Sequence, residues 1–156
     1  MQKVEFVTKD DTQRLCVGWK EWAALPELGI EALEVKVDTG ARTSAIHSFD
    51  VEPFEKEGKP HVRFGLHPDR HSQDPEIFCE APVVDQRVVS DSGGHKEMRY
   101  VIETPIHMGG QSWPIEITLT SRENMAFRML LGRQAMRHRI VVQPEAKYLL
   151  KTPKTN

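Results

Sequence analysis

The 156-residue sequence has little of what marks a secreted, disulfide-rich or membrane-spanning protein. It has two cysteines, Cys16 and Cys79, and they form no Cys-x-x-Cys spacing that would indicate a metal or redox motif. No apolar run is long enough to cross a bilayer, and residues 1–6 lack the apolar core of a signal peptide. We therefore expect a cytoplasmic protein without a membrane partner, in which both thiols are reduced, although a disulfide between them stays open.

The sequence also lacks an excess of either charge. Lysine and arginine number 21 against 23 aspartates and glutamates, which gives a formal net charge of −2. Proteins whose main task is to bind nucleic acid normally carry a basic excess, so we expect no nucleic-acid partner. The three tryptophans, Trp19, Trp22 and Trp113, are interpreted as core or interface residues rather than as a platform for stacked bases.

Motifs for zinc and for nucleotides are missing as well. His67 and His71 have helical i, i+4 spacing, but Pro68 argues against the helix that would align them, and no His-Glu-x-x-His is present. The glycine pairs at 93–94 and 109–110 suit hairpin turns rather than a phosphate-binding loop. We expect no cofactor and no metal, while a metallopeptidase stays open as an alternative that a chelator would test.

Short segments with alternating apolar and polar residues predict an all-β domain. Pro26 and Gly29 break the apolar run 22–29, so it is expected to form a packed turn or short extended piece. One short helix is expected at 133–137, a polar loop at 67–76, and hairpin turns at 90–95 and 109–110. We predict a domain at 14–150, a loose lead-in at 1–13 and a flexible tail at 151–156. Strands are expected at 14–19, 34–37, 44–48, 61–66, 78–84, 87–89, 99–103, 106–108, 113–120 and 139–142.

One motif, Asp38-Thr39-Gly40, places a carboxylate directly after a predicted strand. A peptidase built on carboxylates needs two of them sharing one proton and one water molecule. The chain has one convincing Asp-Thr-Gly, because Asp91-Ser92-Gly93 lacks a suitable preceding apolar strand. The second carboxylate is therefore expected from a second copy of the chain on a two-fold axis. The alternative is that Asp38 caps a turn and Gly40 supplies a positive φ.

Together with a downstream Leu131-Gly132-Arg133, this motif resembles the retropepsins, single-domain aspartic peptidases that act as dimers. Residues 18–29, 36–45 and 127–135 resemble the bacterial retropepsin-like aspartic peptidase family that is labelled "ATP-dependent zinc protease" (RimB-like). The resemblance covers residues 14–150, and some members of that family are associated with an ATP-grasp ligase that adds glutamates to a ribosomal protein. The label itself is not supported by the residues, which contain neither a zinc motif nor a nucleotide-binding loop.

The resemblance implies a closed retropepsin-like barrel, a two-fold homodimer and an aspartic endopeptidase in which Asp38 of each chain activates a water molecule. In that scheme the Thr39 hydroxyl bonds across the axis, and Gly40 lets backbone amides approach the carboxylate. The resemblance gives a structural role to Leu131, Gly132 and Arg133. It gives the role of a flap, which closes over substrate, to Ser92, Gly93 and Gly94.

Arg42 departs from the viral retropepsins, which carry an aspartate at this position that pairs with the arginine corresponding to Arg133. A cation here would leave Arg133 without that partner and stand beside the cleft. Because guanidinium groups bind carboxylates well, we expect an acidic or glutamate-rich peptide tail as substrate. Two alternatives stay open, a local ion pair of Arg42 and a non-catalytic module that binds acidic tails. The expected substrate-binding residues are Ala41, Arg42, Arg87, Lys96 and Arg99.

Overall fold

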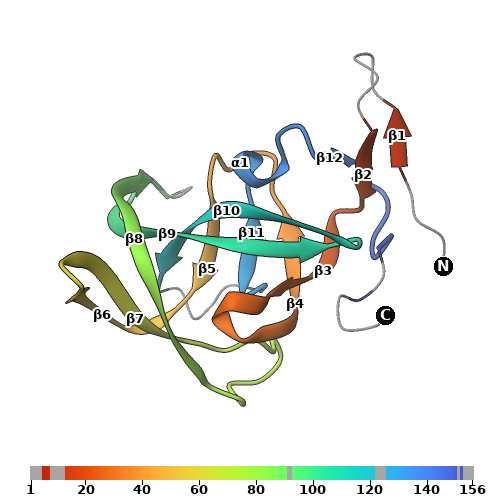
Figure 1. Ribbon diagram of the computed structural model, residues 1–156. Helices are drawn as coiled ribbons and strands as arrows, with labels where there is room; N and C mark the ends of the chain where they lie inside the picture. The colour runs from red at the N-terminus through yellow and green to blue at the C-terminus, as the bar shows by residue number, and fades with distance from the viewer. Residues whose placement is uncertain (1–4, 8–12, 91–92, 122–125, 151, 153–156) are drawn as a thin grey trace.

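The computed structural model describes residues 5–7, 13–90, 93–121, 126–150 and 152, and it is mostly β-sheet with one short α-helix (Figure 1). This confirms the predicted all-β class. Over the described residues, no helix is long and apolar enough to cross a membrane. The helical segments are α1 (Arg133–Met136) and the 3-10 turn η1 (Pro26–Leu28). The strands are β1 (Glu5–Val7), β2 (Gln13–Val17), β3 (Lys20–Leu25), β4 (Ile30–Val37), β5 (Ser44–His47), β6 (Phe49–Lys56), β7 (Lys59–Leu66), β8 (Ile77–Ser90), β9 (Lys96–Met108), β10 (Gln111–Thr120), β11 (Met129–Leu131) and β12 (Ile140–Val142).

Nine strands form one sheet in the order β10-β5-β11-β4-β3-β9-β8-β7-β6, and β10 also pairs with β9. The paired strands therefore close into a ring, but the strand pairing is much more extensive at some positions of the ring than at others. β9 follows β10 in register from Gln111 to Thr118, whereas β3 meets β9 at one pair, Ala24 with His107. β8, β7 and β6 extend beyond this ring, to the left in Figure 1. The predicted closed barrel is thus closed only in part, because one seam rests on a single residue pair.

A smaller sheet joins the two ends of the domain. β2 pairs antiparallel with β1 and parallel with β12, with Leu15 opposite Ile140. The buried Glu21 carboxylate then fixes the C-terminal segment, because it accepts the backbone N–H groups of Gly18, Leu149 and Leu150 at 2.8, 2.8 and 3.1 Å. A carboxylate removed from water needs such partners.

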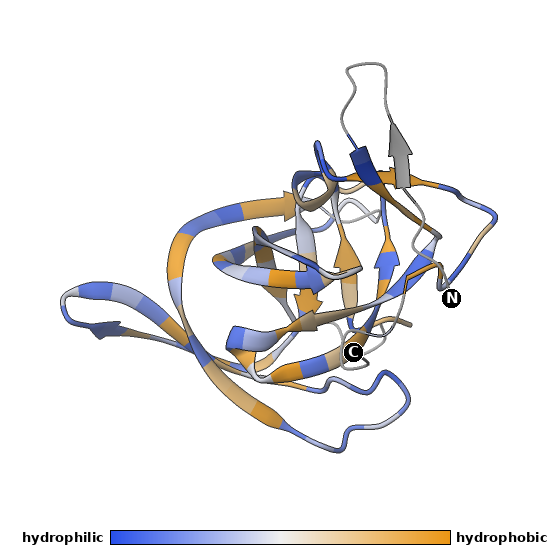
Figure 2. Ribbon diagram, turned by 45° about the vertical axis from the view of Figure 1, so that its right-hand side comes forward, coloured by the Kyte–Doolittle hydropathy of each residue, from blue (hydrophilic) through white to orange (hydrophobic). Residues whose placement is uncertain are grey.

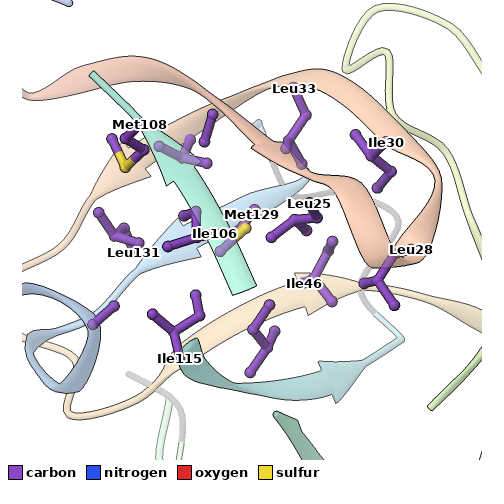
Figure 3. Close-up of a cluster of buried hydrophobic side chains, with 14 of the residues drawn as sticks. Leu25, Leu28, Ile30, Leu33, Ile46, Ile106, Met108, Ile115, Met129 and Leu131 are labelled. Atoms are coloured by element: carbon purple, nitrogen blue, oxygen red, sulfur yellow. The ribbon is translucent and has the colours of Figure 1, made fainter. Parts of the chain in front are cut away.

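The core fills the inside of the strand ring. Orange and blue segments alternate along the strands in Figure 2, as expected where one face of a strand is buried and the other meets solvent. In Figure 3, Ile106, Met108, Ile115, Met129 and Leu131 point toward one another, and each is at most 1% exposed. Burial of these side chains fixes β11 beside β4 at the point where the loop with Asp38 begins.

The structure differs from the predicted strands in several places. β3 forms where a packed turn or short extended piece was expected at 22–29, and β4 begins at Ile30 rather than at residue 34. β6 was not predicted, because it contains Pro53 and several charged residues, which are tolerated on the edge of a sheet. β8 and β9 form one long hairpin where shorter separate strands were predicted, with a register shift between Val83 and Asp85. Of the predicted lead-in at 1–13 the structure describes residues 5–7, which form β1, and residue 13, and of the predicted tail at 151–156 it describes residue 152.

Candidate functional site

The loop after β4 holds the Asp38 carboxylate through its own backbone. The Asp38 N–H donates to the Leu131 carbonyl at 2.9 Å, which continues the parallel pairing of β4 with β11. The Ala41 N–H donates to the Asp38 carbonyl at 3.2 Å, and the Gly40 N–H donates to Asp38 Oδ1 at 2.9 Å. Asp38 is half-buried, whereas Thr39 and Gly40 are exposed. The turn therefore presents a carboxylate with a fixed orientation at the surface.

Gly40 is needed for space rather than for backbone conformation. It is not one of the glycines with positive φ, so the alternative that it supplies a left-handed turn is wrong. A Cβ at this position would lie 3.2 Å from Asp38 Oδ1. The missing side chain thus lets the backbone amide approach the carboxylate, as the Asp-Thr-Gly motif predicts.

Gly132 and Arg133 pack directly on the same loop. The Gly132 N–H donates to Ser44 Oγ at 3.0 Å, and a Cβ on Gly132 would lie 2.6 Å from the Thr43 carbonyl carbon. Arg133 donates from its backbone N–H to the Ala41 carbonyl and from Nη1 to the Thr39 carbonyl, both at 2.9 Å. Leu131 is fully buried at the end of β11. Two motifs distant in sequence therefore build one surface.

A cleft of about 660 Å³ opens beside this loop, between it and the β8 strand. Four of the five predicted substrate-binding residues line it, namely Ala41, Arg42, Arg87 and Arg99. Lys96, the fifth, is exposed and is not among the described residues that line the cleft. The full lining is Asp38, Gly40, Ala41, Arg42, Thr43, Ala45, Arg87, Val88, Val89, Ser90, Arg99, Thr118 and Leu130.

Arg87 is already engaged by two carboxylates. Its Nε donates to Asp85 Oδ2 at 2.7 Å and its Nη1 to Glu116 Oε1 at 2.9 Å, and Nη1 also lies 3.4 Å from Thr43 Oγ1. The hydrogen bonds to Asp85 and Glu116 raise the pKa of Arg87, and the Arg87 bond lowers the pKa of Asp85. This side chain therefore links the long hairpin to the Asp38 loop.

Arg99 is 7% exposed and is also neutralised within the chain. Its Nε donates to Glu97 Oε1 at 2.8 Å, and its Nη1 lies 3.4 Å from the Thr118 hydroxyl. Thr118 in turn donates to the Ser44 carbonyl at 3.2 Å. The local ion pair that was weighed for Arg42 is thus found instead at Arg87 and Arg99.

Arg42 differs from both of these arginines. It is exposed at the mouth of the cleft and forms no ion pair with any residue in the part of the chain that the structure describes. An unpaired guanidinium at the edge of a cleft is available to a carboxylate of a ligand.

The hairpin of β8 and β9 projects over the side of the cleft. Ser90 pairs with Lys96 at its end, Gly94 has a φ of +83°, and Gly93 and Gly94 are exposed. Ser92, the remaining predicted flap residue, lies outside the described residues. Val88 and Met98 face each other across the hairpin and are 61% and 58% exposed. The predicted hairpin is confirmed, and its action as a flap stays a prediction.

The described residues contain no group of three or more His, Cys, Asp or Glu side chains that could hold a metal ion. His67 Nε2 lies 3.3 Å from Glu76 Oε2, and the His67 ring stacks on the Phe49 ring with 4.4 Å between the ring centroids.

Cys16 and Cys79 are both free thiols. Burial raises the pKa of the Cys79 thiol to about 12.

Comparison with known proteins assigns the chain to a family. A sequence profile described as "Retropepsin-like aspartic endopeptidase RimB" matches residues 16–153, which is most of the chain. The chain belongs to the RimB-like family. This confirms the resemblance seen in the Asp38 and Gly132 motifs. The crystal structure of a Legionella pneumophila protein of unknown function (DUF785) superposes with a TM-score of 0.70 at 26% identity, covering 85% of this chain and 95% of that one.

Curated proteins that are similar in sequence to this chain have names that differ from that of the family. Proteins from Shewanella pealeana, Desulfotalea psychrophila and Parasynechococcus marenigrum are 45%, 42% and 43% identical to this chain over 137, 134 and 139 residues. Each is named "Probable alpha-L-glutamate ligase". The matches cover 88%, 86% and 89% of this chain and 30%, 29% and 30% of the relatives. The chain thus spans about 30% of the length of these curated relatives.

These names contradict the predicted aspartic endopeptidase, and with it the assignment as a hydrolase and protease. A ligase forms a bond, whereas a peptidase hydrolyses one. The prediction relied on a motif and on a second carboxylate that a partner chain would have to supply. The motif accounts for the geometry of the Asp38 loop, but loop geometry does not determine the reaction.

Several residues in the cleft or in contact with its lining were not predicted from the sequence. Glu116 lies on β10 and pairs with Arg87 on β8, so this contact depends on how both strands pair with β9. Glu97 pairs with Arg99 two residues away on β9. Thr118 was placed in a predicted strand, but nothing in its spacing indicated that it faces the cleft. The alternating patterns of β9 and β10 were the available signal, because they show which residues share a face.

Proposed function

We propose that this chain serves α-L-glutamate ligation by holding a glutamate-rich, acidic polypeptide in the cleft beside Asp38 and Arg42. The observation that carries the proposal is the exposed Arg42 guanidinium at the mouth of a cleft of about 660 Å³. A guanidinium binds a carboxylate through two parallel hydrogen bonds. The names of the relatives supply the glutamate chemistry. Because the chain matches about 30% of those relatives, the bond-forming step belongs to the part of the ligases that it does not match.

The walls of the cleft suit such a ligand. Val88 and Val89 of β8 and Leu130 of β11 provide apolar surface for the methylene groups of glutamate side chains. Arg87 and Arg99 already hold internal carboxylates, so they shape the wall without adding free positive charge. Arg42 therefore supplies the attraction, and its position sets where the first carboxylate of the ligand lies.

The domain works as a two-fold dimer in which the Asp38 loops of two copies face each other. Support comes from the exposure of Thr39 and Gly40, which leaves the tip of the loop accessible to a second chain. Sedimentation velocity over a range of concentrations tests this part, with a dimer expected. A monomer at every concentration would contradict it. The cytoplasmic location stays a prediction.

Calorimetric titration with hexa-α-L-glutamate tests the binding function. We expect Arg42→Gln to weaken binding about tenfold or more, because a charge-assisted hydrogen bond is lost. Arg137→Gln is the matched control, since Arg137 is exposed but does not line the cleft. Binding should weaken as salt is raised, because exposed charges are screened. Equal binding by the two variants, or no binding by the wild type, would contradict the proposal.

A further inference from the structure

The free charges of the cleft are of both signs. Arg87 and Arg99 are each neutralised by carboxylates of the same chain, at 2.7 to 2.9 Å. Among the described residues that line the cleft, the charges left without an ionic partner are the cation of Arg42 and the anion of Asp38. Because the Asp38 carboxylate repels the carboxylates of an acidic ligand, such a ligand gains affinity if it also carries a cationic group near Asp38.

These two groups lie on one tight loop. The Ala41 N–H bond to the Asp38 carbonyl closes the turn between them, and both side chains line the same cleft. Asp38 Oδ1 accepts the Gly40 N–H, while Asp38 Oδ2 has no hydrogen-bond donor among the described residues. The loop therefore presents a carboxylate that can pair with a cation and, four positions later in the sequence, a guanidinium that can pair with an anion, both lining one cleft.

From this pairing we infer that the cleft recognises glutamate through a free α-amino group as well as a carboxylate. The α-ammonium group pairs with Asp38, and a carboxylate of the same residue or its neighbour pairs with Arg42. This inference rests on the proposed binding function and refines it. The interior of a glutamate chain has no ammonium group, so it leaves Asp38 unpaired and meets its repulsion. In a dimer, the partner's Asp38 loop would add a second carboxylate and favour the ammonium further.

Two kinds of ligand have both an α-ammonium group and a carboxylate: free glutamate, and a glutamate at the amino terminus of a peptide. The cleft volume of about 660 Å³ lies in the range of sites for small organic ligands and admits either one. The common requirement is an unblocked α-amino group beside a carboxylate.

The test compares tri-α-L-glutamate with a free amino terminus, its N-acetylated form, and free L-glutamate. For the wild type, acetylation should weaken peptide binding about tenfold or more, because it removes the charge that pairs with Asp38. Asp38→Asn should bring the two peptides to a similar affinity, because it removes the attraction that favours the free-amine peptide and the repulsion that disfavours the acetylated one. Arg42→Gln should weaken both peptides. Binding of free glutamate with the same Asp38 dependence would identify the amino acid as a ligand, and binding of the peptide alone would assign the amino-terminal residue.

A second readout keeps the test decisive if Asp38→Asn fails to fold. An α-amino group loses its proton near pH 8, so wild-type binding of the free-amine peptide should fall between pH 7 and pH 9.5, while the acetylated peptide changes little. Equal binding of both peptides at pH 7, with Arg42 dependence retained, would overturn this inference and leave the proposed function standing. Failure of every ligand to bind would overturn the proposed function itself.

Discussion

Arg133 Nη1 donates a hydrogen bond to the backbone carbonyl of Thr39 at 2.9 Å, although the two residues are 94 positions apart in the sequence. The start of α1 thereby fixes the tip of the Asp38 loop. We predict that Arg133→Met lowers the free energy of unfolding by about 1 kcal/mol, the usual contribution of one hydrogen bond. It should also weaken binding of acidic peptide by loosening the loop. Urea denaturation and peptide titration measure these effects, with Arg137→Met as control. Equal effects of the two substitutions would show that the Thr39 contact is unimportant.

Gly132 tolerates no side chain where β11 passes the Asp38 loop. A Cβ there would lie 2.6 Å from the Thr43 carbonyl carbon and 2.9 Å from the Ser44 nitrogen, and backbone atoms cannot yield as a flexible side chain can. Gly132→Ala should therefore lower the free energy of unfolding by about 3 kcal/mol, as overpacking of a rigid site does.

Gly40→Ala provides the comparison, because its Cβ would meet Asp38 Oδ1 at 3.2 Å. Gly40→Ala should lower the free energy of unfolding only slightly, while it should weaken ligand binding because it disturbs the Asp38 carboxylate. Chemical denaturation of both variants measures the difference. Similar stability of Gly132→Ala and wild type would contradict the packing seen here.

Glu34 makes stability depend on pH at the acid end. Burial acts to raise its pKa, but hydrogen bonds from Tyr148 and Arg70 outweigh burial, so the pKa of Glu34 lies below its ordinary value. A carboxyl group with a lowered pKa stabilises the fold above its unfolded pKa, and this contribution disappears as pH falls through the folded pKa. We predict that Glu34→Gln reduces the loss of stability between pH 5 and pH 3.

Thermal unfolding at a series of pH values measures this effect. Glu31→Gln is the matched control, because Glu31 is an exposed glutamate on the same strand. Identical pH profiles for Glu34→Gln and the wild type would contradict the role assigned to the Glu34 carboxylate.

The Cys79 thiol should react slowly with alkylating reagents. Burial raises its pKa to about 12, so very little thiolate exists at pH 8, and the thiolate is the reactive form. Iodoacetamide should therefore modify Cys79 far more slowly than a cysteine introduced by Ser90→Cys at an exposed position of the same strand. Peptide mass spectrometry follows each site separately. Comparable rates at the two positions would contradict the environment described for Cys79.

Turn chemistry made much of the fold predictable from sequence. Gly109 and Gly110 adopt φ values of +58° and +79°, which suits the tight hairpin predicted between β9 and β10. The short helix at 133–137 was found at Arg133–Met136. β6 was not predictable, because an edge strand with one exposed face and Pro53 does not show the usual apolar alternation.

The candidate site was predictable only in part. Asp38, Arg42 and Gly132 were identified from motifs, and the structure brings them together around one loop. The pairing of Arg87 with Glu116 could not be predicted, because it depends on contacts between strands that are distant in sequence. The type of reaction could not be predicted from the motif either, since the same loop geometry suits hydrolysis or the binding of a substrate for ligation.

The most direct measurement is a mass spectrum of a glutamate-tailed peptide after incubation and co-elution with the protein. We predict that the peptide co-elutes with the wild type, is lost from Arg42→Gln, and keeps its full mass in both samples. Shorter glutamate products made by the wild type and absent with Asp38→Asn would contradict the proposed role in binding for ligation, as would a failure of the peptide to co-elute at all.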